Sequence, residues 1–277
     1  MAISRPNSKR NLDMALRRRG NSDEDFLRTR TLLANTIVAQ MLPNGAMKGG
    51  SALKIRFGDR KTRATSDFDA ARASDLDAFI VEFEDKLENG WNNFTARLIR
   101  HQPASPAGVP NAYVMKPFDV KLSYLGVSWC TVPFELGHDE IGDAEDPDLI
   151  VPKEASAILQ SLGFPEPKAI PVMRLSHQIA QKIHGASAAN SKRAHDLIDL
   201  QLVIANGEVN YKETRDTCER LFAYRKMQTW PPAVTINQDW DSLYSQQARS
   251  LDVLQNVSDA ATWANELIAK IASESKS

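Results

Sequence analysis

The sequence predicts an α+β fold in which a half that contains both strands and helices is followed by a helical half. Apolar residues alternate with period two between Phe94 and Leu136, as in strands, whereas after the acidic run 139–148 they recur with helical period. Strands are thus expected in the first half of the chain and only helices in the second, which favours α+β over the alternating pattern of a parallel-sheet α/β fold. We therefore expect one domain over residues 1–150 and a helical domain over residues 151–277.

The first domain begins with helical periodicity. A helix is expected over residues 23–42, since Ser22 or Asp23 can cap its start and Pro43 ends it. The next expected elements are a strand at 46–48, a helix at 51–57 with Ser51 as its N-cap, a loop at 58–65, a strand at 66–70 and a helix at 75–87.

The middle of the chain predicts a β-hairpin. Strands are expected at 94–100, 118–124 and 128–136, and Leu125-Gly126 suits a tight turn between the last two. The first two strands are joined by a loop marked by Pro103, Pro106, Gly108 and Pro110. The acidic run 139–148 is expected to be a solvated linker or loop near the domain boundary, and only helices are expected beyond it. These helices lie at 155–162, 173–188, 192–205, 211–224, 239–250 and 258–272, with a breaker at 164–171.

Composition excludes several classes of protein. The net charge is −1 with 25% charged residues, so the chain lacks the bulk basicity typical of many nucleic-acid-binding proteins. Cys130 and Cys218 are isolated, which argues against a disulfide framework and a zinc site. The N-terminus lacks the apolar run of a signal peptide, and no segment approaches eighteen apolar residues. We expect a cytoplasmic protein that does not associate with membranes.

Residues 1–20 form a basic segment, with six Lys and Arg residues against the single acidic residue Asp13. Such a segment can be an arm that binds phosphate or the solvated face of a helix, and the second interpretation is favoured.

The stretch from Lys48 to Asp69 combines a glycine turn with a carboxylate pair. Gly49 and Gly50 can adopt backbone angles closed to other residues, so that amides at the start of the next helix can approach an anion. If residues 66–70 form a strand, Asp67 and Asp69 point to the same face and repel each other unless a cation lies between them. A magnesium ion that carries a nucleoside triphosphate is the usual solution.

A basic loop separates the two motifs. It places Arg56, Arg60, Lys61 and Arg63 between the glycine turn and the aspartates. For each of these side chains, contact with a polyphosphate and ordinary solvation are about equally favoured.

Two-metal phosphoryl transfer requires a third carboxylate. Glu135, at the end of the second hairpin strand, and Asp119, on the first, are the two candidates. Glu135 is favoured because an adjacent strand end can lie beside the aspartate pair, although an exposed structural position remains open for either residue.

A second group of candidate residues lies in the helical half. Lys182 falls on the apolar side of its helix, so its ammonium requires a carboxylate or a phosphate partner. Arg193, Asp196 and Asp199 follow at intervals of three on the next helix and can form an ion network that holds this lysine. The structural role is favoured for the two aspartates, and direct contact with substrate is favoured for Lys182.

Taken in order, these motifs resemble the AbiEii/AbiGii family of nucleotidyltransferase toxins from type IV toxin–antitoxin systems, over most of residues 23–205. K-G-G-S-A-L followed by S-D-F-D is similar to the first family motif. A-Q-K-I-H-G-A and R-A-H-D-L-I-D-L are similar to the lysine motif and the helix that follows it. The family belongs to the polymerase-β-like nucleotidyltransferases, which implies a mixed-sheet catalytic lobe followed by a helical lobe.

The resemblance also implies residue roles. The catalytic set is Asp67, Asp69, Glu135 and Lys182, of which the three carboxylates would bind metal. The nucleotide-binding set is Lys48, Gly49, Gly50, Ser51, Arg63, Ser66, Arg193 and Asp196. The chain departs from the family at two points. Fifteen residues, 52–66, separate Ser51 from Asp67 where the family usually has a shorter gap, and Glu135 stands where an aspartate is more usual.

The implied activity is NTP-dependent, two-metal transfer of a nucleoside monophosphate to an acceptor hydroxyl, with Mg²⁺ or Mn²⁺ as cofactor. In related toxins the acceptor is the 3′ end of tRNA. The resemblance further implies a cognate antitoxin as partner and a role in phage defence. A nucleotidyltransferase that modifies a small molecule and a non-catalytic relative that binds a nucleotide or a partner protein are the alternatives.

Overall fold

The chain is described by a computed structural model over residues 4–104 and 114–275. It divides into two compact units. Unit 1 comprises Met1–Asp59 and Ala64–Val172, and unit 2 comprises Arg60–Arg63 and Met173–Ser277. The expected α+β class is confirmed, because unit 1 contains a mixed sheet with helices and the described part of unit 2 is helical.

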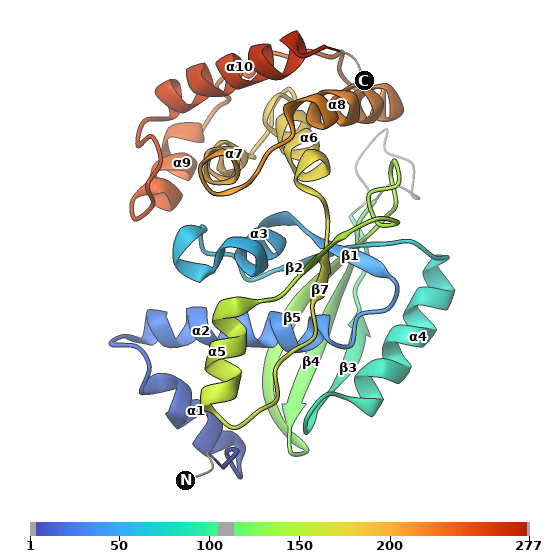
Figure 1. Cartoon of the computed structure of the whole chain (residues 1–277), viewed down its shortest axis with the longest axis vertical. Coiled ribbons are helices and arrows are strands. Elements are labelled where there is room, and N and C mark those ends of the chain that lie inside the picture. Colours follow the sequence, from blue (N-terminus) through green and yellow to red (C-terminus); the bar gives the residue numbers. More distant parts are fainter. Residues whose placement is uncertain (1–3, 105–113, 276–277) are drawn as a thin grey trace. The chain divides into compact units, whose positions relative to one another are not determined.

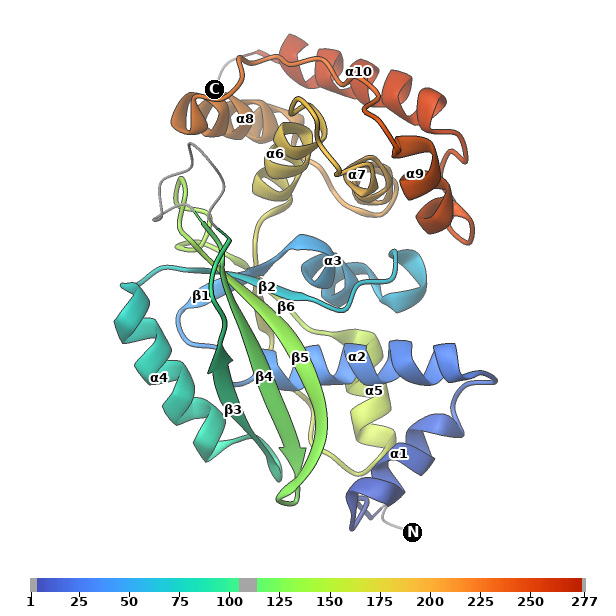
Figure 2. The ribbon, with the colours of Figure 1, turned by 180° about the vertical axis from the view of Figure 1, so that it is seen from behind.

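Unit 1 is built on a sheet that has seven strands within the described ranges, in the order β3-β4-β5-β2-β1-β7-β6 (Figures 1 and 2). The β2–β5 and β1–β7 pairs are parallel and the other neighbouring pairs are antiparallel. The strands are β1 (Gly45–Lys48), β2 (Phe68–Arg72), β3 (Phe94–Arg100), β4 (Lys116–Tyr124), β5 (Val127–His138), β6 (Asp148–Ile150) and β7 (Ile170–Val172).

Helices pack on this sheet and bury one of its faces. Figure 2 shows α4 alongside β3, and α2 contacts both β5 and α5. The rings of Phe68 and Phe134 lie 5.4 Å apart in the core, and Phe83 of α4 lies 5.2 Å from Phe134. Because side chains alternate along a strand, the residues that directly follow Phe68 on β2 and Phe134 on β5 project to the opposite face. The helices are α1 (Lys9–Arg17), α2 (Asp23–Ala39), α3 (Gly49–Phe57), α4 (Leu76–Asn89) and α5 (Lys153–Ser161), with a 3-10 turn η1 (Asp59–Lys61).

Several elements of unit 1 agree closely with the sequence-based expectation. β3 has the expected bounds, and the β4–β5 turn has Leu125 and Gly126 at φ 50° and 76°, as in a type I′ hairpin. The hydroxyl of Ser22 accepts a hydrogen bond from the Asp25 amide at 3.0 Å and so caps α2. Turn and cap signals are local, which explains why the sequence revealed them.

Two local expectations were wrong, and a third was correct only in part. Ser51 is not an N-cap, because the left-handed Gly49 (φ 67°) turns the chain at once and α3 begins there, with Lys48 as its cap. The run 139–148 is a loop up to residue 147, as expected, but it is not solvated throughout: Asp143 is buried and accepts a hydrogen bond from the Glu140 amide. Nor is everything beyond the run helical, since β6 and β7 follow it.

The position of the unit boundary reflects these two strands. We expected a boundary at residue 150, whereas unit 1 continues to Val172. The difference arises because β7 pairs in parallel with β1, with Met47 opposite Val172, and thereby keeps the segment up to Val172 on the sheet.

The basic N-terminal segment contains α1, whose Leu12 and Leu16 are fully buried. Asp13 pairs with Lys9 and accepts a hydrogen bond from the Trp129 indole at 2.8 Å. This part of the segment is therefore a packed helix. Of the expected loop markers, Pro106, Gly108 and Pro110 lie outside the described residues.

Unit 2 contains the helices α6 (Leu175–Ala186), α7 (His195–Asn206), α8 (Tyr211–Arg225), α9 (Trp240–Ala248) and α10 (Val257–Ser273). α6 packs against α7 and α8, and α10 contacts α7, α8 and α9. In the described residues, every helix is too short or too polar to span a bilayer.

Candidate active site

Three charged residues form a row across neighbouring strands of unit 1. Lys48 of β1 lies opposite Asp69 of β2, and Asp69 lies opposite Glu135 of β5. Residues that are paired across a sheet project to the same face, so the ammonium and the two carboxylates share one surface. Asp69 is half-buried and Glu135 is exposed, which leaves this surface accessible.

The glycine turn lies directly against this row. A Cβ atom at Gly49 would lie 2.0 Å from Oδ2 of Asp69, so only glycine leaves room for the carboxylate. Ser51 is buried in the first turn of α3, where its hydroxyl lies 3.4 Å from the Lys48 carbonyl and 3.5 Å from the Asp69 amide. The Ser51 hydroxyl therefore links the glycine turn to β2. Gly50, which lies between Gly49 and Ser51 in the sequence, is buried.

The remaining motif residues lie at the start of β2. Asp67 directly precedes the strand and is exposed. Ser66 donates a hydrogen bond to Oδ1 of Asp67 at 2.9 Å, which orients this carboxylate.

The register distinguishes the two candidates for the third carboxylate. Glu135 is directly opposite Asp69, whereas Asp119 lies one strand further away, opposite Pro133. Asp119 is also engaged elsewhere: its Oδ2 lies 2.8 Å from Nζ of Lys121, and this hydrogen bond holds the pKa of Asp119 below its usual value. The structure thus brings Glu135, and not Asp119, next to Asp69.

Sequence reasoning missed a pair of carboxyl groups near Lys48. A Cβ atom at Gly137 would lie 2.7 Å from Nζ of Lys48, so the lysine extends over β5 at this glycine. Burial, together with a hydrogen bond to Asp139, raises the pKa of Asp143 to about 7, although the Lys48 charge acts in the opposite direction. Gly142, within the acidic run, is the feature of the sequence that could have indicated this pair. It permits the tight turn (φ 83°) that folds these carboxyl groups inward.

In unit 2, Lys182 is buried and held by two carboxylates. Its Nζ lies 2.6 Å from Oδ2 of Asp199 and 3.4 Å from Oδ1 of Asp196. Arg193 Nε lies 2.5 Å from Asp196, and Arg63 Nε lies 3.0 Å from Asp199. These five side chains alternate in sign from Arg193 to Arg63, and we call them the charge chain.

The charge chain confirms the expected ion network around Lys182 and extends it to the basic loop. Burial favours the neutral form of Asp199, but Lys182 and Arg63 outweigh it and lower the pKa of this carboxyl. With three cations and two carboxylates, the charge chain carries one net positive charge. Its Arg193 end is 54% exposed, so an anionic ligand can reach it. Asp196 is fully buried, and we therefore expect it to affect a nucleotide only through its cationic partners.

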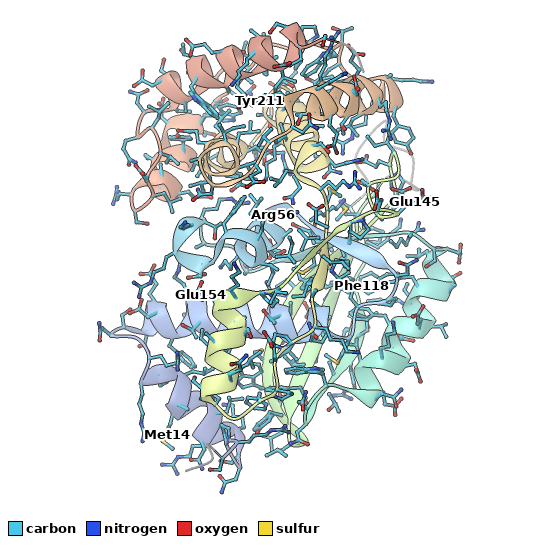
Figure 3. The ribbon with its side chains drawn as sticks, in the orientation of Figure 1. Met14, Arg56, Phe118, Glu145, Glu154 and Tyr211 are labelled. Carbon is cyan, nitrogen blue, oxygen red and sulfur yellow. The ribbon has the colours of Figure 1, made fainter. Side chains whose placement is uncertain are left out.

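The basic loop is anchored at its start. Lys54 and Arg28 bind the carboxylate of Asp59 at 2.8 and 2.7 Å, and Glu154 accepts a hydrogen bond from the Asp59 amide at 2.7 Å. Arg56, labelled with Glu154 in Figure 3, pairs with Asp148 at 2.7 Å. Arg56 and Arg63 are thus held by carboxylates, whereas Arg60 and Lys61 are exposed.

The candidate residues fall into two sets, one in each unit. Lys48, Gly49, Gly50, Ser51, Ser66, Asp67, Asp69 and Glu135 belong to unit 1, and Arg63, Lys182, Arg193 and Asp196 belong to unit 2. Within the described ranges, no three His, Cys, Asp or Glu side chains are already gathered to hold a metal ion.

Comparison with known proteins identifies a family and a fold. The family model described as the nucleotidyl transferase AbiEii toxin of type IV toxin–antitoxin systems matches residues 31–266. The chain is similar to the structure of MenT4, a nucleotidyltransferase toxin from Mycobacterium tuberculosis H37Rv, with 14% identity and a TM-score of 0.57 over 97% of this chain and 90% of that one. JHP933 from Helicobacter pylori matches with 14% identity and a TM-score of 0.49 over 91% and 94% of the two chains. No curated protein matches the chain.

Proposed function

The chain belongs to the AbiEii family of nucleotidyltransferase toxins of type IV toxin–antitoxin systems, and from this premise we propose that it transfers a nucleoside monophosphate from an NTP to the 3′ end of tRNA. In this reaction the acceptor hydroxyl oxygen bonds to the α-phosphorus and the bond to the bridging oxygen breaks. Pyrophosphate leaves, and the hydroxyl proton passes to solvent.

The observation that supports this proposal most directly is the row formed by Lys48, Asp69 and Glu135 beside the Gly49 turn. Amides at the N-terminus of a helix bind phosphate, and α3 begins at this turn. A cation and two carboxylates next to such a turn offer complementary partners for phosphate oxygens and for a divalent metal ion.

The residues of this surface fit Mg²⁺ by the chemistry of their donors. Asp67, Asp69 and Glu135 offer carboxylate oxygens, which Mg²⁺ and Mn²⁺ prefer. Mg²⁺ is usually held by one or two carboxylates together with substrate phosphates, so a preformed cage of three side chains is not required. The room left by Gly49 beside Asp69 Oδ2 keeps that carboxylate at the turn where phosphates would bind. When bound, the metal would lower the pKa of the acceptor hydroxyl and stabilise the departing pyrophosphate.

The chain's own residues would position the nucleotide. The amides at Gly50 and Ser51, at the start of α3, would orient the triphosphate, and Lys48 would neutralise one of its oxygens. The family resemblance also implies a role in the reaction for Lys182, Arg193 and Arg63, a role that their positive charge suits. As a toxin of this family, the protein would act in the cytoplasm under the control of a cognate antitoxin and would contribute to phage defence.

A labelling experiment tests the reaction. Purified protein is incubated with each of the four α-labelled NTPs, total tRNA and Mg²⁺, and incorporation of label into RNA is measured. We expect transfer with at least one NTP, loss of transfer in EDTA, recovery in Mg²⁺ or Mn²⁺, and none for Asp69→Ala. Absence of label in tRNA with all four nucleotides would contradict the proposal, whereas label in a small-molecule fraction would indicate another acceptor.

A matched pair of variants tests the third carboxylate. Glu135→Gln should lower the rate of transfer at least about a hundredfold, because the charge opposite Asp69 is lost. Asp119→Asn removes the same charge one strand further away and should change the rate less than about threefold. Equal losses of transfer rate for the two variants would show that the strand register does not identify the third metal-binding carboxylate.

A further inference from the structure

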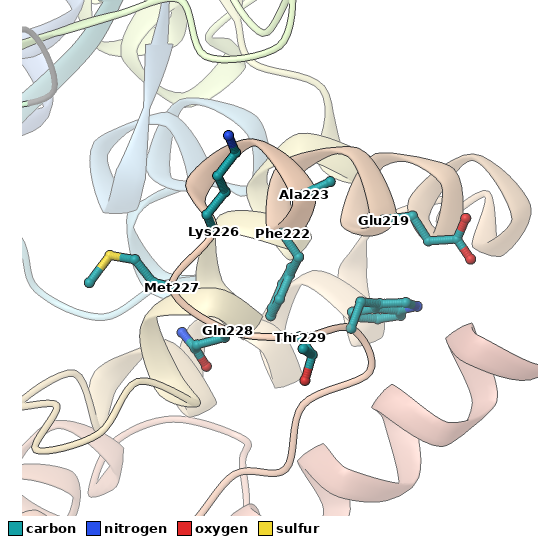
Figure 4. A pocket seen from close by; sticks show the side chains of 8 residues that line it. Glu219, Phe222, Ala223, Lys226, Met227, Gln228 and Thr229 are labelled. Atoms are coloured by element: carbon teal, nitrogen blue, oxygen red, sulfur yellow. The ribbon is translucent and has the colours of Figure 1, made fainter.

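The helical unit contains an open pocket that the proposed reaction does not use. It lies beside the C-terminal end of α8 and has a volume of about 810 Å³. Figure 4 shows Phe222 pointing from α8 toward the segment that carries Gln228 and Thr229, with Lys226 and Met227 at the edge. The lining residues are Glu219, Phe222, Ala223, Lys226, Met227, Gln228, Thr229 and Trp230.

Two aromatic residues line this pocket, the buried Phe222 and the half-buried Trp230, and they are held in place. The rings of Phe222 and Trp230 lie 5.4 Å apart in an edge-to-face arrangement. The amide of Gln228 is fixed because it donates to the His184 carbonyl at 2.9 Å and accepts from the Ser187 hydroxyl at 2.7 Å. The pocket is therefore formed before any ligand binds, which lowers the entropic cost of binding.

The charge around the pocket is positive. The sequence from Arg220 to Gln238 contains three cationic residues and no acidic residue. Glu219, at the other side of the pocket, is paired with Arg215 at 3.1 Å, which offsets its charge. Among the described residues, Lys226 forms no salt bridge, and its side chain is exposed. Met227 is 71% exposed, so an apolar side chain also lies open at the edge.

We propose that this pocket, which we call the Trp230 pocket, binds unpaired bases of the RNA acceptor, with Lys226 contacting an adjacent phosphate. The inference rests on the proposed function, since it assumes that the acceptor is RNA. A volume of about 810 Å³ falls within the range of ligand pockets and can hold more than one base. Bases stack on aromatic rings with little regard to sequence, and a cation at the edge neutralises the backbone.

The alternative occupant is an acidic segment of a partner protein. Carboxylate side chains could pair with Lys226, but they would leave the half-buried indole of Trp230 and the exposed thioether of Met227 without a matching surface. A nucleotide chain matches both features, because it carries planar rings and a negative charge at every residue. The combination therefore favours RNA.

Direct binding, measured without turnover, tests the inference. A fluorescein-labelled single-stranded oligoribonucleotide of twelve adenosines is titrated with the full chain in EDTA and without NTP, and the anisotropy gives Kd. Trp230→Leu should weaken binding about tenfold or more, whereas Trp230→Phe should retain most of it. Trp263→Leu on α10, which replaces another half-buried indole in unit 2, is the matched control and should change Kd less than twofold.

Charge variants test the phosphate contact. Lys226→Gln should weaken binding about threefold or more and reduce the salt dependence of log Kd by about one. Lys212→Gln removes an exposed cation from the first turn of the same helix and should leave both unchanged. Ala223→Glu places a carboxylate at the exposed rim with little risk to folding and should weaken binding at least as much as Lys226→Gln. Thermal unfolding followed by circular dichroism checks that each variant is folded.

The outcomes separate this inference from the proposed function. Asp69→Ala should bind the oligonucleotide as the wild type does, because binding at the Trp230 pocket does not require catalysis. If the wild type transfers nucleotide to tRNA but Trp230→Leu, Ala223→Glu and Lys226→Gln all bind RNA normally, the inference is wrong and the proposed function stands. If polyglutamate of equal charge displaces the RNA as well as unlabelled RNA does, the pocket serves an acidic peptide and the inference is also wrong. If the wild type neither binds RNA nor transfers nucleotide to tRNA, both the inference and the proposed function are wrong.

Discussion

Replacement of Asp199 by alanine removes the carboxylate that two cations of the charge chain share. The exposed fraction of the side chain is 1% for Asp199, 5% for Lys182 and 15% for Arg63, so water cannot fully replace the lost partner. Removal of one partner from a buried ion pair costs about 3–5 kcal/mol, because the other charge remains buried. Lys182 retains Asp196 at 3.4 Å, which places the expected loss near the lower limit, at about 3 kcal/mol.

The complementary variant Lys182→Met should be tolerated better. Without the ammonium, Asp199 still pairs with Arg63 and Asp196 still pairs with Arg193, so each buried carboxylate keeps a cation. Methionine also fills much of the volume of the lysine stem. We therefore expect a loss of stability of about 1–2 kcal/mol for this variant, less than for Asp199→Ala, although nucleotide transfer should fall sharply.

Urea unfolding followed by circular dichroism at several pH values checks both expectations. Because the pKa of Asp199 is lowered in the folded state, its stabilising effect is present above the ordinary carboxyl pKa of 3.8 and is lost as the pH falls further, through the folded-state pKa. The difference between wild type and Asp199→Asn should be constant from pH 5 to 8 and should shrink below 3.8. An Asp199→Ala protein within about 0.5 kcal/mol of the wild type, or less affected than Lys182→Met, would refute the reasoning.

Three further predictions concern unit 1. Asp143 has its pKa raised from 3.8 to about 7, so its ionisation destabilises the fold progressively between these values, by at most about 4 kcal/mol. In urea unfolding, Asp143→Asn should therefore gain stability over the wild type as the pH rises from 4 to 7, and a constant difference would contradict this. Gly49→Ala should abolish transfer while the fold survives in circular dichroism, since its Cβ would overlap the Asp69 carboxylate. Gly137→Ala should displace the Lys48 ammonium and raise the KM for NTP, and steady-state kinetics with unchanged KM would refute the proposed contact.

Features encoded by neighbouring residues were predicted correctly, whereas features that depend on distant parts of the sequence were not. The β4–β5 hairpin was predictable because Leu125-Gly126 specifies a turn between alternating strands. Glu135 could be favoured over Asp119, but only the parallel register of β2 and β5 shows that it lies opposite Asp69. Pairing between distant strands is set by tertiary contacts that a local pattern does not encode.

The misses share one physical cause. β7 contains Pro171 and has only three residues, so the sequence pattern predicted a helix-breaking segment there. Parallel pairing with β1 makes it a strand. Asp143 looked like a solvated charge, but burial and Asp139 make it a carboxyl group of raised pKa. In each case the surroundings, and not the residue, determined the outcome. For Lys182, helical periodicity correctly indicated a buried ammonium, whereas the pairing of Arg63 with Asp199 joins residues 136 positions apart.

The assignment of Arg60–Arg63 to unit 2 limits how this protein can be dissected. A fragment that starts at Met173 would contain Asp199 but not Arg63, so one of the two cations on that carboxylate would be missing. A fragment that ends at Val172 would carry the four residues 60–63 without the helices to which they belong. The helical half would therefore lack part of its own unit if it were expressed or transplanted alone. An exchange of helical units between relatives would have to carry this four-residue segment as a second piece.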